Sequence, residues 1–191
     1  MLHRCVSFFA VGVLSLTVGM VPGCGEGADR AARYVVATGG SGGVYYPTGG
    51  AIGRLVRAAD LGIQLDVRPS GGSVANARQL ASGAADFAIM QNDIASYARA
   101  GERMFDAPIE TITGVASLYP EHIQVIADAG AGIAELADLR GKRVAIGAIG
   151  SGTEGNALQI LEAVGLTTDD LGRVERLKAS ESADYLRDGR V

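Results

Sequence analysis

The sequence predicts an α/β protein whose strands lie in parallel sheets and whose chain divides into two lobes. Short apolar runs alternate with stretches in which apolar residues recur at helical spacing, which is typical of parallel sheets with right-handed crossovers. A strand, a Gly/Ser loop and a helix follow one another at 34–57 and again at 142–164. Two extended runs, 112–118 and 122–127, lie between these repeats and can carry the chain from one lobe to the other.

The composition is that of a globular domain apart from its N-terminus. The chain has 191 residues, of which 48% are hydrophobic and 20% are charged, and Gly outnumbers Pro by 28 to 5. Its formal net charge is -4. No basic patch indicates a nucleic-acid partner, so none is expected.

Residues 1–23 have the pattern of a lipoprotein-type signal peptide. A basic start precedes an apolar run over 6–21, which is short for a spanning helix of roughly 20 residues. The tripeptide before Cys24 resembles a bacterial lipobox, in which the cysteine is lipidated and becomes the mature N-terminus. Pro22 is unusual there, so ordinary cleavage and an uncleaved signal anchor are the alternatives. We expect an extracytoplasmic protein, in the periplasm or at the cell surface, anchored through Cys24 and a polar tether over 24–33.

The cysteine count agrees with this location. Cys5 lies in the signal peptide and is lost with it, which leaves Cys24 alone and excludes a disulfide within the mature chain. A lone cysteine directly after an export signal fits a lipid attachment point better than a nucleophile.

The first lobe opens with the strand 34–37, a glycine-rich loop around Ser41 and a helix over 51–57. Glycines let the backbone N–H groups approach another molecule closely, and a helix start adds N–H donors that suit a carboxylate or phosphate. Tyr45 and Tyr46 stand where the helix would begin and offer flat apolar walls with hydroxyl tips. The loop therefore predicts an anion site, the alternative being a flexible turn between two core elements.

The remaining elements of the first lobe repeat this order. A strand over 63–67 leads to a helix that starts near Val74, with Ser73 as a plausible N-cap and Gly83 as its stop. A buried strand over 87–90 precedes a last helix that runs to Gly101.

Three turn clusters follow these strands. Because the carboxyl ends of parallel strands meet at one edge of a sheet, we expect the clusters to lie together, where open α/β folds bind ligands. They are 39–46, 70–73 and 91–93.

The second lobe comprises a short helix over 133–139, a strand over 142–147, a loop and the helix 154–164. Residues 182–191 parallel 76–85, after which the first lobe continues into a strand. We therefore expect this chain to be the N-terminal part of a longer protein, with the second lobe incomplete.

The loop before the last of these helices, 150–155, matches the pattern G-x-G-x-x-G. A dinucleotide site also needs an acid at the end of the next strand, and Glu175 is not clearly at a strand end. The Rossmann interpretation is therefore the weaker one in an exported protein. We favour Ser151, Thr153 and the local N–H groups as a cap for an anionic ligand group.

No catalytic set is recognisable. His122 is the only histidine after the signal, no Cys or Ser motif accompanies it, and no carboxylate cluster has metal-ligand spacing. A Walker A lysine is absent from both loops. We expect a binding protein that is not an enzyme and that uses neither a cofactor nor a metal.

The motifs of residues 34–191 resemble those of the TAXI-type substrate-binding proteins of TRAP transporters. The segments that carry the resemblance are GGSGGVYYP at 39–47, GG at 49–50, SGGSVAN at 70–76, LASGAADFAI at 80–89 with Gln91, LRGKRVAIG at 139–147 and GSGT at 150–153.

This resemblance implies a type II periplasmic-binding-protein-like fold with lobes at 34–118 and 119–191, the second including the crossover. It implies a monomer that binds glutamate, glutamine or a related amino acid or dicarboxylate and delivers it to a sodium-driven membrane permease. The implied ligand-binding residues are Gly42, Gly43, Val44, Tyr45, Tyr46, Ser73, Gln91, Tyr119, Ser151, Gly152 and Thr153.

Two functions of other classes stay open at this point. One is an exported enzyme whose loops bind phosphate or another anionic metabolite. The other is a sensor domain that uses the same two-lobe clamp for signalling.

Overall fold

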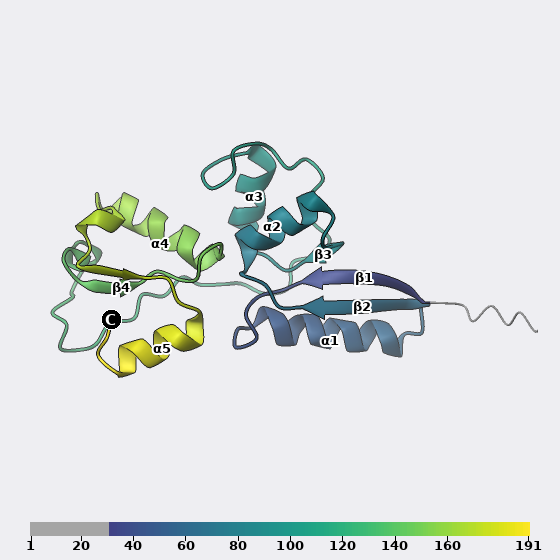
Figure 1. Cartoon of the computed structure of the whole chain (residues 1–191), viewed down its shortest axis with the longest axis horizontal. Helices are drawn as coiled ribbons and strands as arrows, with labels where there is room; N and C mark the ends of the chain where they lie inside the picture. The colour runs from purple at the N-terminus through teal and green to yellow at the C-terminus, as the bar shows by residue number, and fades with distance from the viewer. Residues whose placement is uncertain (1–30) are drawn as a thin grey trace, which may run out of the picture. The chain divides into compact units, whose positions relative to one another are not determined.

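Two parallel sheets organise residues 31–191, the part of the chain that the structure, a computed structural model, describes (Figure 1). The first sheet has the strand order β2-β1-β3 and the second consists of β4 and β5. The predicted α/β class, with one parallel sheet in each lobe, is confirmed. The predicted signal peptide and the lipidation site Cys24 lie outside the described residues. No helix within 31–191 is long and apolar enough to cross a membrane.

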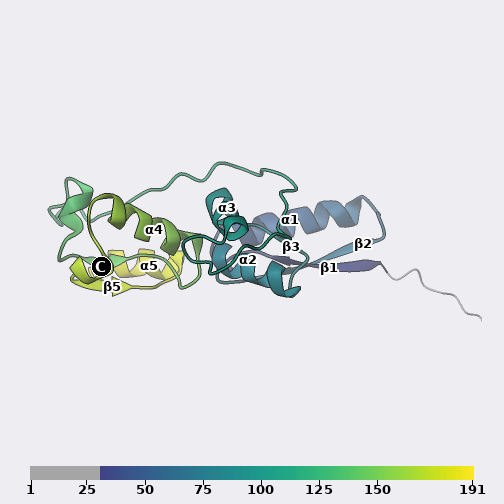
Figure 2. The same cartoon turned by 90° about the horizontal axis from the view of Figure 1, so that it is seen from above.

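The first lobe follows the predicted order of elements. Its helix α1 begins at Tyr45, as the sequence suggested, and runs beside β1 and β2 (Figures 1 and 2). Gly49 permits this packing, because a methyl group at Gly49 would lie 2.8 Å from Thr38 Cγ2. The elements are β1 (Ala32–Ala37), α1 (Tyr45–Ala58), β2 (Ile63–Arg68), α2 (Ser73–Ser82), β3 (Phe87–Ala88) and α3 (Asn92–Ala100).

Two expectations for this lobe were wrong in detail. The third strand covers only Phe87 and Ala88 and not 87–90, and Phe87 is 42% exposed, because the strand lies at the edge of the sheet and pairs only with the end of β1. Ser73 is not the N-cap of α2, since it is the first helical residue and its Oγ accepts a hydrogen bond from Gln91 N at 3.1 Å.

The second lobe has its own apolar core around one two-stranded sheet. Strand β5, which the sequence did not identify, pairs in parallel with β4. Buried side chains from η1, α4 and the segments that connect the elements fill this core: Leu139, Ile146, Leu161, Leu166 and Leu171. The elements are η1 (Leu136–Leu139), β4 (Arg143–Ala145), α4 (Gly152–Ala163), η2 (Thr168–Asp170), β5 (Arg173–Glu175) and α5 (Ala179–Arg187).

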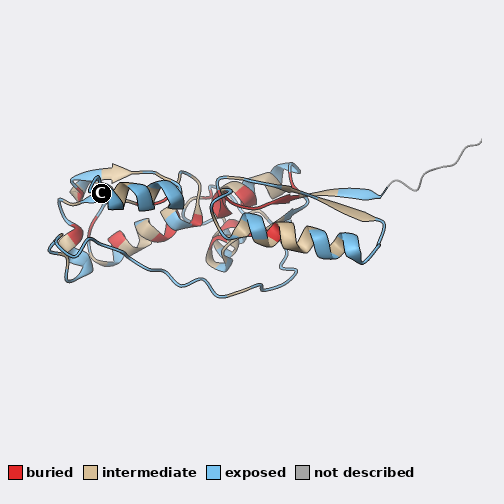
Figure 3. Cartoon of the chain, turned by 90° about the horizontal axis from the view of Figure 1, so that it is seen from below, coloured by how far each residue is buried: buried red, intermediate tan, exposed pale blue. Residues whose placement is uncertain are grey.

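The crossover between the lobes has no regular secondary structure. The two extended runs at 112–118 and 122–127 form no strand, because nothing in residues 31–191 pairs with them. Most of their apolar side chains are consequently exposed, with Val115 at 81% and Ile126 at 72% (Figure 3), whereas Ile112 is buried in the core of the first lobe.

The carboxyl ends of the first three strands are joined by one buried side chain, Asn76. Its Nδ2 donates to the carbonyl of Thr38 at 2.5 Å and to that of Ile89 at 2.7 Å. Its Oδ1 accepts from Ser70 Oγ at 2.6 Å. Thr38 follows β1, Ser70 follows β2 and Ile89 follows β3, so the three turn clusters meet at one edge of the sheet, as predicted.

We predict that Asn76→Ala lowers the free energy of unfolding by about 3 kcal/mol, because the buried carbonyl of Ile89 loses its donor and that of Thr38 keeps only the Ser70 hydroxyl. A urea titration of the full chain, followed by circular dichroism, measures this change. Asn92→Ala is the matched control, since Asn92 is exposed at the start of α3, and it should change stability by no more than about 0.5 kcal/mol. Equal effects of the two variants would contradict the role given to Asn76.

Candidate ligand-binding site

A cavity of about 1440 Å³ is lined by both lobes and by the crossover between them. Its first-lobe wall consists of the loops that follow the three strands of the first sheet. Its second-lobe wall includes the loop before α4, the start of α5 and apolar side chains such as Ile160. The volume exceeds the roughly 300–1,000 Å³ of most small-molecule sites, because the cavity extends over the apolar interior of the second lobe.

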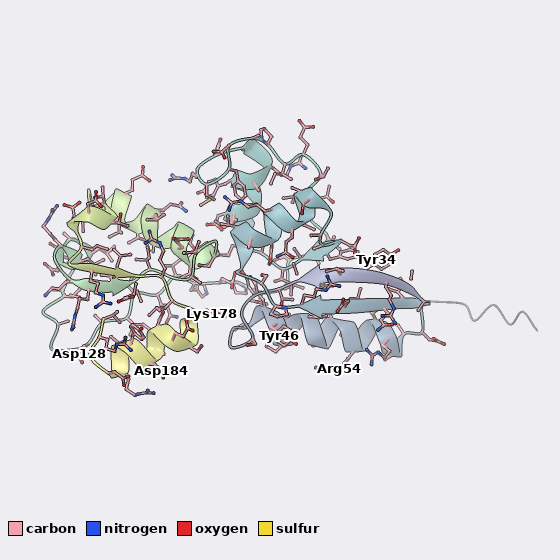
Figure 4. All side chains as sticks on the ribbon, viewed as in Figure 1. Tyr34, Tyr46, Arg54, Asp128, Lys178 and Asp184 are labelled. Carbon is pink, nitrogen blue, oxygen red and sulfur yellow. The ribbon has the colours of Figure 1, made fainter. Side chains whose placement is uncertain are left out.

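The structure brings most of the predicted ligand-binding residues to this cavity. Tyr46 and Tyr119 are not among the lining residues: Tyr46 lies on α1 (Figure 4), and the hydroxyl of Tyr119 is buried without a hydrogen-bond partner in residues 31–191. The predicted residues that do line the cavity are Gly42, Gly43, Val44, Tyr45, Ser73, Gln91, Ser151, Gly152 and Thr153.

Tyr45 connects the first loop with the crossover. Its hydroxyl donates to Glu121 Oε2 at 2.6 Å. Burial of the phenol and this hydrogen bond raise the pKa of Tyr45 above its ordinary value, so the hydroxyl stays protonated at neutral pH and remains a donor. Glu121 is a cavity residue that the sequence did not reveal, because the hydrogen bond spans 76 positions of the chain.

The second Gly/Ser loop is hydrogen-bonded to the first turn of α4, the helix that follows it. Ser151 Oγ accepts from Glu154 N at 3.0 Å, and Glu154 Oε2 accepts from Gly150 N at 2.9 Å. Arg176 pairs with the other carboxylate oxygen of Glu154 at 2.7 Å. One N–H group of the loop therefore already has an anionic partner from within the chain. The spacing Ser-x-x-Glu is that of a capping box, but here the carboxylate accepts from Gly150 N, while the N–H of the N-cap Ser151 donates to the carbonyl of Ala148.

Gln91 binds the other lobe. Its Nε2 donates to Asn156 Oδ1 at 2.7 Å, and Asn156 Nδ2 donates to Asp93 Oδ2 at 2.7 Å. The amide of Gln91 lies so close to Gly152 that a methyl group there would be 1.3 Å from Gln91 Oε1. Within 31–191 this Oε1 is buried and has no hydrogen-bond partner. The packing of the Gln91 amide against Gly152 thus positions the loop before α4 on the first lobe.

Comparison with known proteins gives a family and a similar solved structure. The sequence model of the NMT1-like family matches residues 36–191. Among solved structures, the chain is similar to the alkanesulfonate-binding protein SsuA from Xanthomonas axonopodis pv. citri bound to MOPS, with a TM-score of 0.49 and 16% identity. The alignment covers 84% of this chain and 52% of that one, so the chain spans about half the length of this solved structure.

We predict that Gly152→Ala destabilises the full chain by about 2 kcal/mol, because the new methyl group displaces the Gln91 amide and breaks its hydrogen bond to Asn156. Helix propensity alone would act in the opposite direction by up to about 1 kcal/mol, so the sign of the change is informative. Urea unfolding measures it. Gly114→Ala, where no atom lies within 4 Å of the added methyl group, is the control. A stabilised Gly152→Ala variant would show that this contact between the lobes does not form.

Proposed function

The chain belongs to the NMT1-like family, and on this premise we propose that it is an extracytoplasmic solute-binding receptor of a TAXI-type TRAP transporter. The proposed ligand is glutamate, glutamine or a related small carboxylate. The receptor delivers it to the membrane permease of the transporter. In the same proposal Cys24 carries the lipid that holds the receptor at the membrane.

The observation that supports this function is the shared cavity. Tyr45 from the first lobe and Thr153 from the second lobe line the same space. Small-molecule sites are concave, with a few polar groups on largely apolar walls, and they occur preferentially between domains. A solute receptor needs this arrangement, because each lobe then supplies part of the contacts and closure excludes water from the ligand.

The proposed mode of binding uses backbone donors of the first loop. Within residues 31–191, the N–H groups of Gly40, Ser41 and Gly42 donate to no backbone carbonyl. They and the start of α1 offer hydrogen bonds to an anionic group. Tyr45 provides a ring wall, and Thr153 faces the ligand from the second lobe. Ser151 retains its hydroxyl proton for a ligand while its oxygen caps α4.

Isothermal titration calorimetry of the full chain tests the proposal. The ligands are L-glutamate, L-glutamine, glutarate and inorganic phosphate, and the products are analysed by chromatography after long incubation. Submicromolar binding of a carboxylate without turnover supports a receptor. Product formation, or binding of phosphate alone, contradicts it.

We predict that Ser151→Ala combined with Thr153→Ala weakens carboxylate binding by about 1–3 kcal/mol, from the loss of hydrogen bonds in the closed site. Thr153→Ala alone separates the effect on the ligand from the loss of the cap on α4, because Ser151 makes the capping bond. Thr168→Ala, outside the lining of the cavity, is the control and should leave the affinity unchanged. Unchanged affinity in the double variant would mean that the second loop is only a turn.

A further inference from the structure

We propose that the end of the first lobe where β1 begins docks onto a membrane surface of anionic lipid. This inference rests on the proposed receptor function, because it assumes that Cys24 holds the protein at a membrane. It adds a second contact with that membrane, made by three exposed arginines and two exposed leucines. These residues are Arg33, Arg54, Leu55, Arg57 and Leu61.

Three segments meet at this end of the lobe. Strand β1 begins at Ala32, helix α1 ends at Ala58, and a short turn leads from α1 to β2. The turn is fastened to the strand, because Ala32 N donates to the carbonyl of Gly62 at 2.8 Å. Figure 1 shows the end of α1 beside the starts of β1 and β2. Side chains from the first residues of β1, the last turns of α1 and the turn therefore share one end of the lobe.

This end is basic, although the chain as a whole has a net charge of -4. Residues 31–62 contain Arg33, Arg54 and Arg57 but only one acidic residue, Asp60. All three arginines are exposed, and none forms an ion pair within the described part of the chain. Figure 4 shows Arg54 on the side of α1 that faces away from the strands. Guanidinium groups suit the phosphate oxygens of lipid head groups, because they bind phosphate with two parallel hydrogen bonds.

Two large apolar side chains are exposed beside these charges. Leu55 on α1 is 71% exposed, and Leu61 in the turn is 62% exposed. Leu55 stands between Arg54 and Arg57 in the sequence. Leucines beside basic residues are typical of segments that lie in a membrane interface, where the apolar side chains enter the boundary between head groups and acyl chains.

The tether favours a membrane as the partner of this surface. Cys24 precedes Ala31 by seven residues, so an extended chain keeps Ala31 within roughly 25 Å of a lipid attached to that cysteine. This end of the lobe is therefore the part of the described chain that the tether holds nearest to the head groups. Tethering raises the effective concentration of a weak second contact, and a basic patch commonly supplements a lipid anchor in this way.

Docking by this end would leave the ligand cavity accessible. The strands of the first sheet run from this end towards the loops that line the cavity, and β1 contains 6 residues. At about 3.3 Å per residue, these loops would lie roughly 20 Å from the docked end. A docked receptor would therefore collect its ligand on the side that faces away from the head groups.

Cosedimentation with lipid vesicles tests the docking. The chain 25–191 is used, because residues 31–191 form a compact unit separate from residues 1–30, and the apolar run over 6–21 would itself bind lipid. One set of vesicles is phosphatidylcholine, and the other contains equal parts of phosphatidylcholine and phosphatidylglycerol. We expect binding at least about tenfold tighter to the anionic vesicles. This preference should disappear at about 1 M salt, where the Debye length falls to about 3 Å.

The combined variant Arg33→Gln, Arg54→Gln and Arg57→Gln should bind the anionic vesicles about 100-fold more weakly, since each basic residue near the surface contributes about fivefold. Leu55→Ser with Leu61→Ser should weaken binding by about tenfold, because less apolar surface leaves water. The affected side chains are exposed, so the circular dichroism spectrum and the urea midpoint should not change.

The matched control removes the same charge from the second lobe. It combines Arg140→Gln, Arg173→Gln and Arg187→Gln, whose side chains are 61%, 63% and 71% exposed, and it should change vesicle binding by less than about threefold. Equal binding to both kinds of vesicle, or equal losses in the two arginine variants, would overturn the docking proposal.

Calorimetry with L-glutamate, L-glutamine, glutarate and phosphate separates this result from the receptor function. None of the replaced residues lines the cavity, so the variants should keep the ligand affinity of the parent chain. Ligand binding without a preference for anionic vesicles would remove the docking and leave the receptor. Vesicle binding without binding of any of these ligands would remove the receptor alone.

Discussion

The site depends on one buried amide. Strand β3 contributes two residues and two backbone pairings, which is little to hold the third loop of the first lobe beside the other two. The side chain of Asn76 supplies the missing connection, because its two N–H groups bind the carbonyls that follow β1 and β3 while its oxygen binds Ser70 after β2. A fully buried asparagine in this position is stable only because its donors and its acceptor all have partners.

Side-chain amides also make the contact between the lobes that lies nearest the loops. The Gln91–Asn156–Asp93 series puts a carboxylate only at its end, and Gly152 leaves room for the Gln91 side chain. Farther out, Tyr97 donates to Gln159 at 2.9 Å and Arg103 pairs with Glu162 at 3.0 Å on the exposed side. The Gln91–Asn156–Asp93 hydrogen bonds hold the second loop against the first lobe with a single charge at the contact, the carboxylate of Asp93.

The sequence was sufficient for features set by local chemistry. The start of α1 at Tyr45, the stop of α2 at Gly83 and the meeting of the three loops all follow from spacing and turn residues. Features that depend on long-range partners were missed or wrong. The runs at 112–118 and 122–127 have the composition of strands, but a strand also needs a neighbour, and none pairs with them in residues 31–191. Glu121 could not be found, because only the folded chain brings it to Tyr45.

The lack of strands in the crossover has a consequence for Glu121. A residue in a ladder is positioned by backbone hydrogen bonds on both sides, whereas Glu121 lies in an exposed segment and is attached to the first lobe through its side chain by Tyr45. Tyr45 in turn is the first residue of α1, directly after the loop whose Gly40, Ser41 and Gly42 N–H groups donate to no backbone carbonyl within residues 31–191. In the proposed binding mode the donors for the acidic group and the phenol that holds Glu121 are therefore neighbours in the chain. A ligand that binds these N–H groups therefore contacts the segment next to the tyrosine that attaches the crossover to the first lobe.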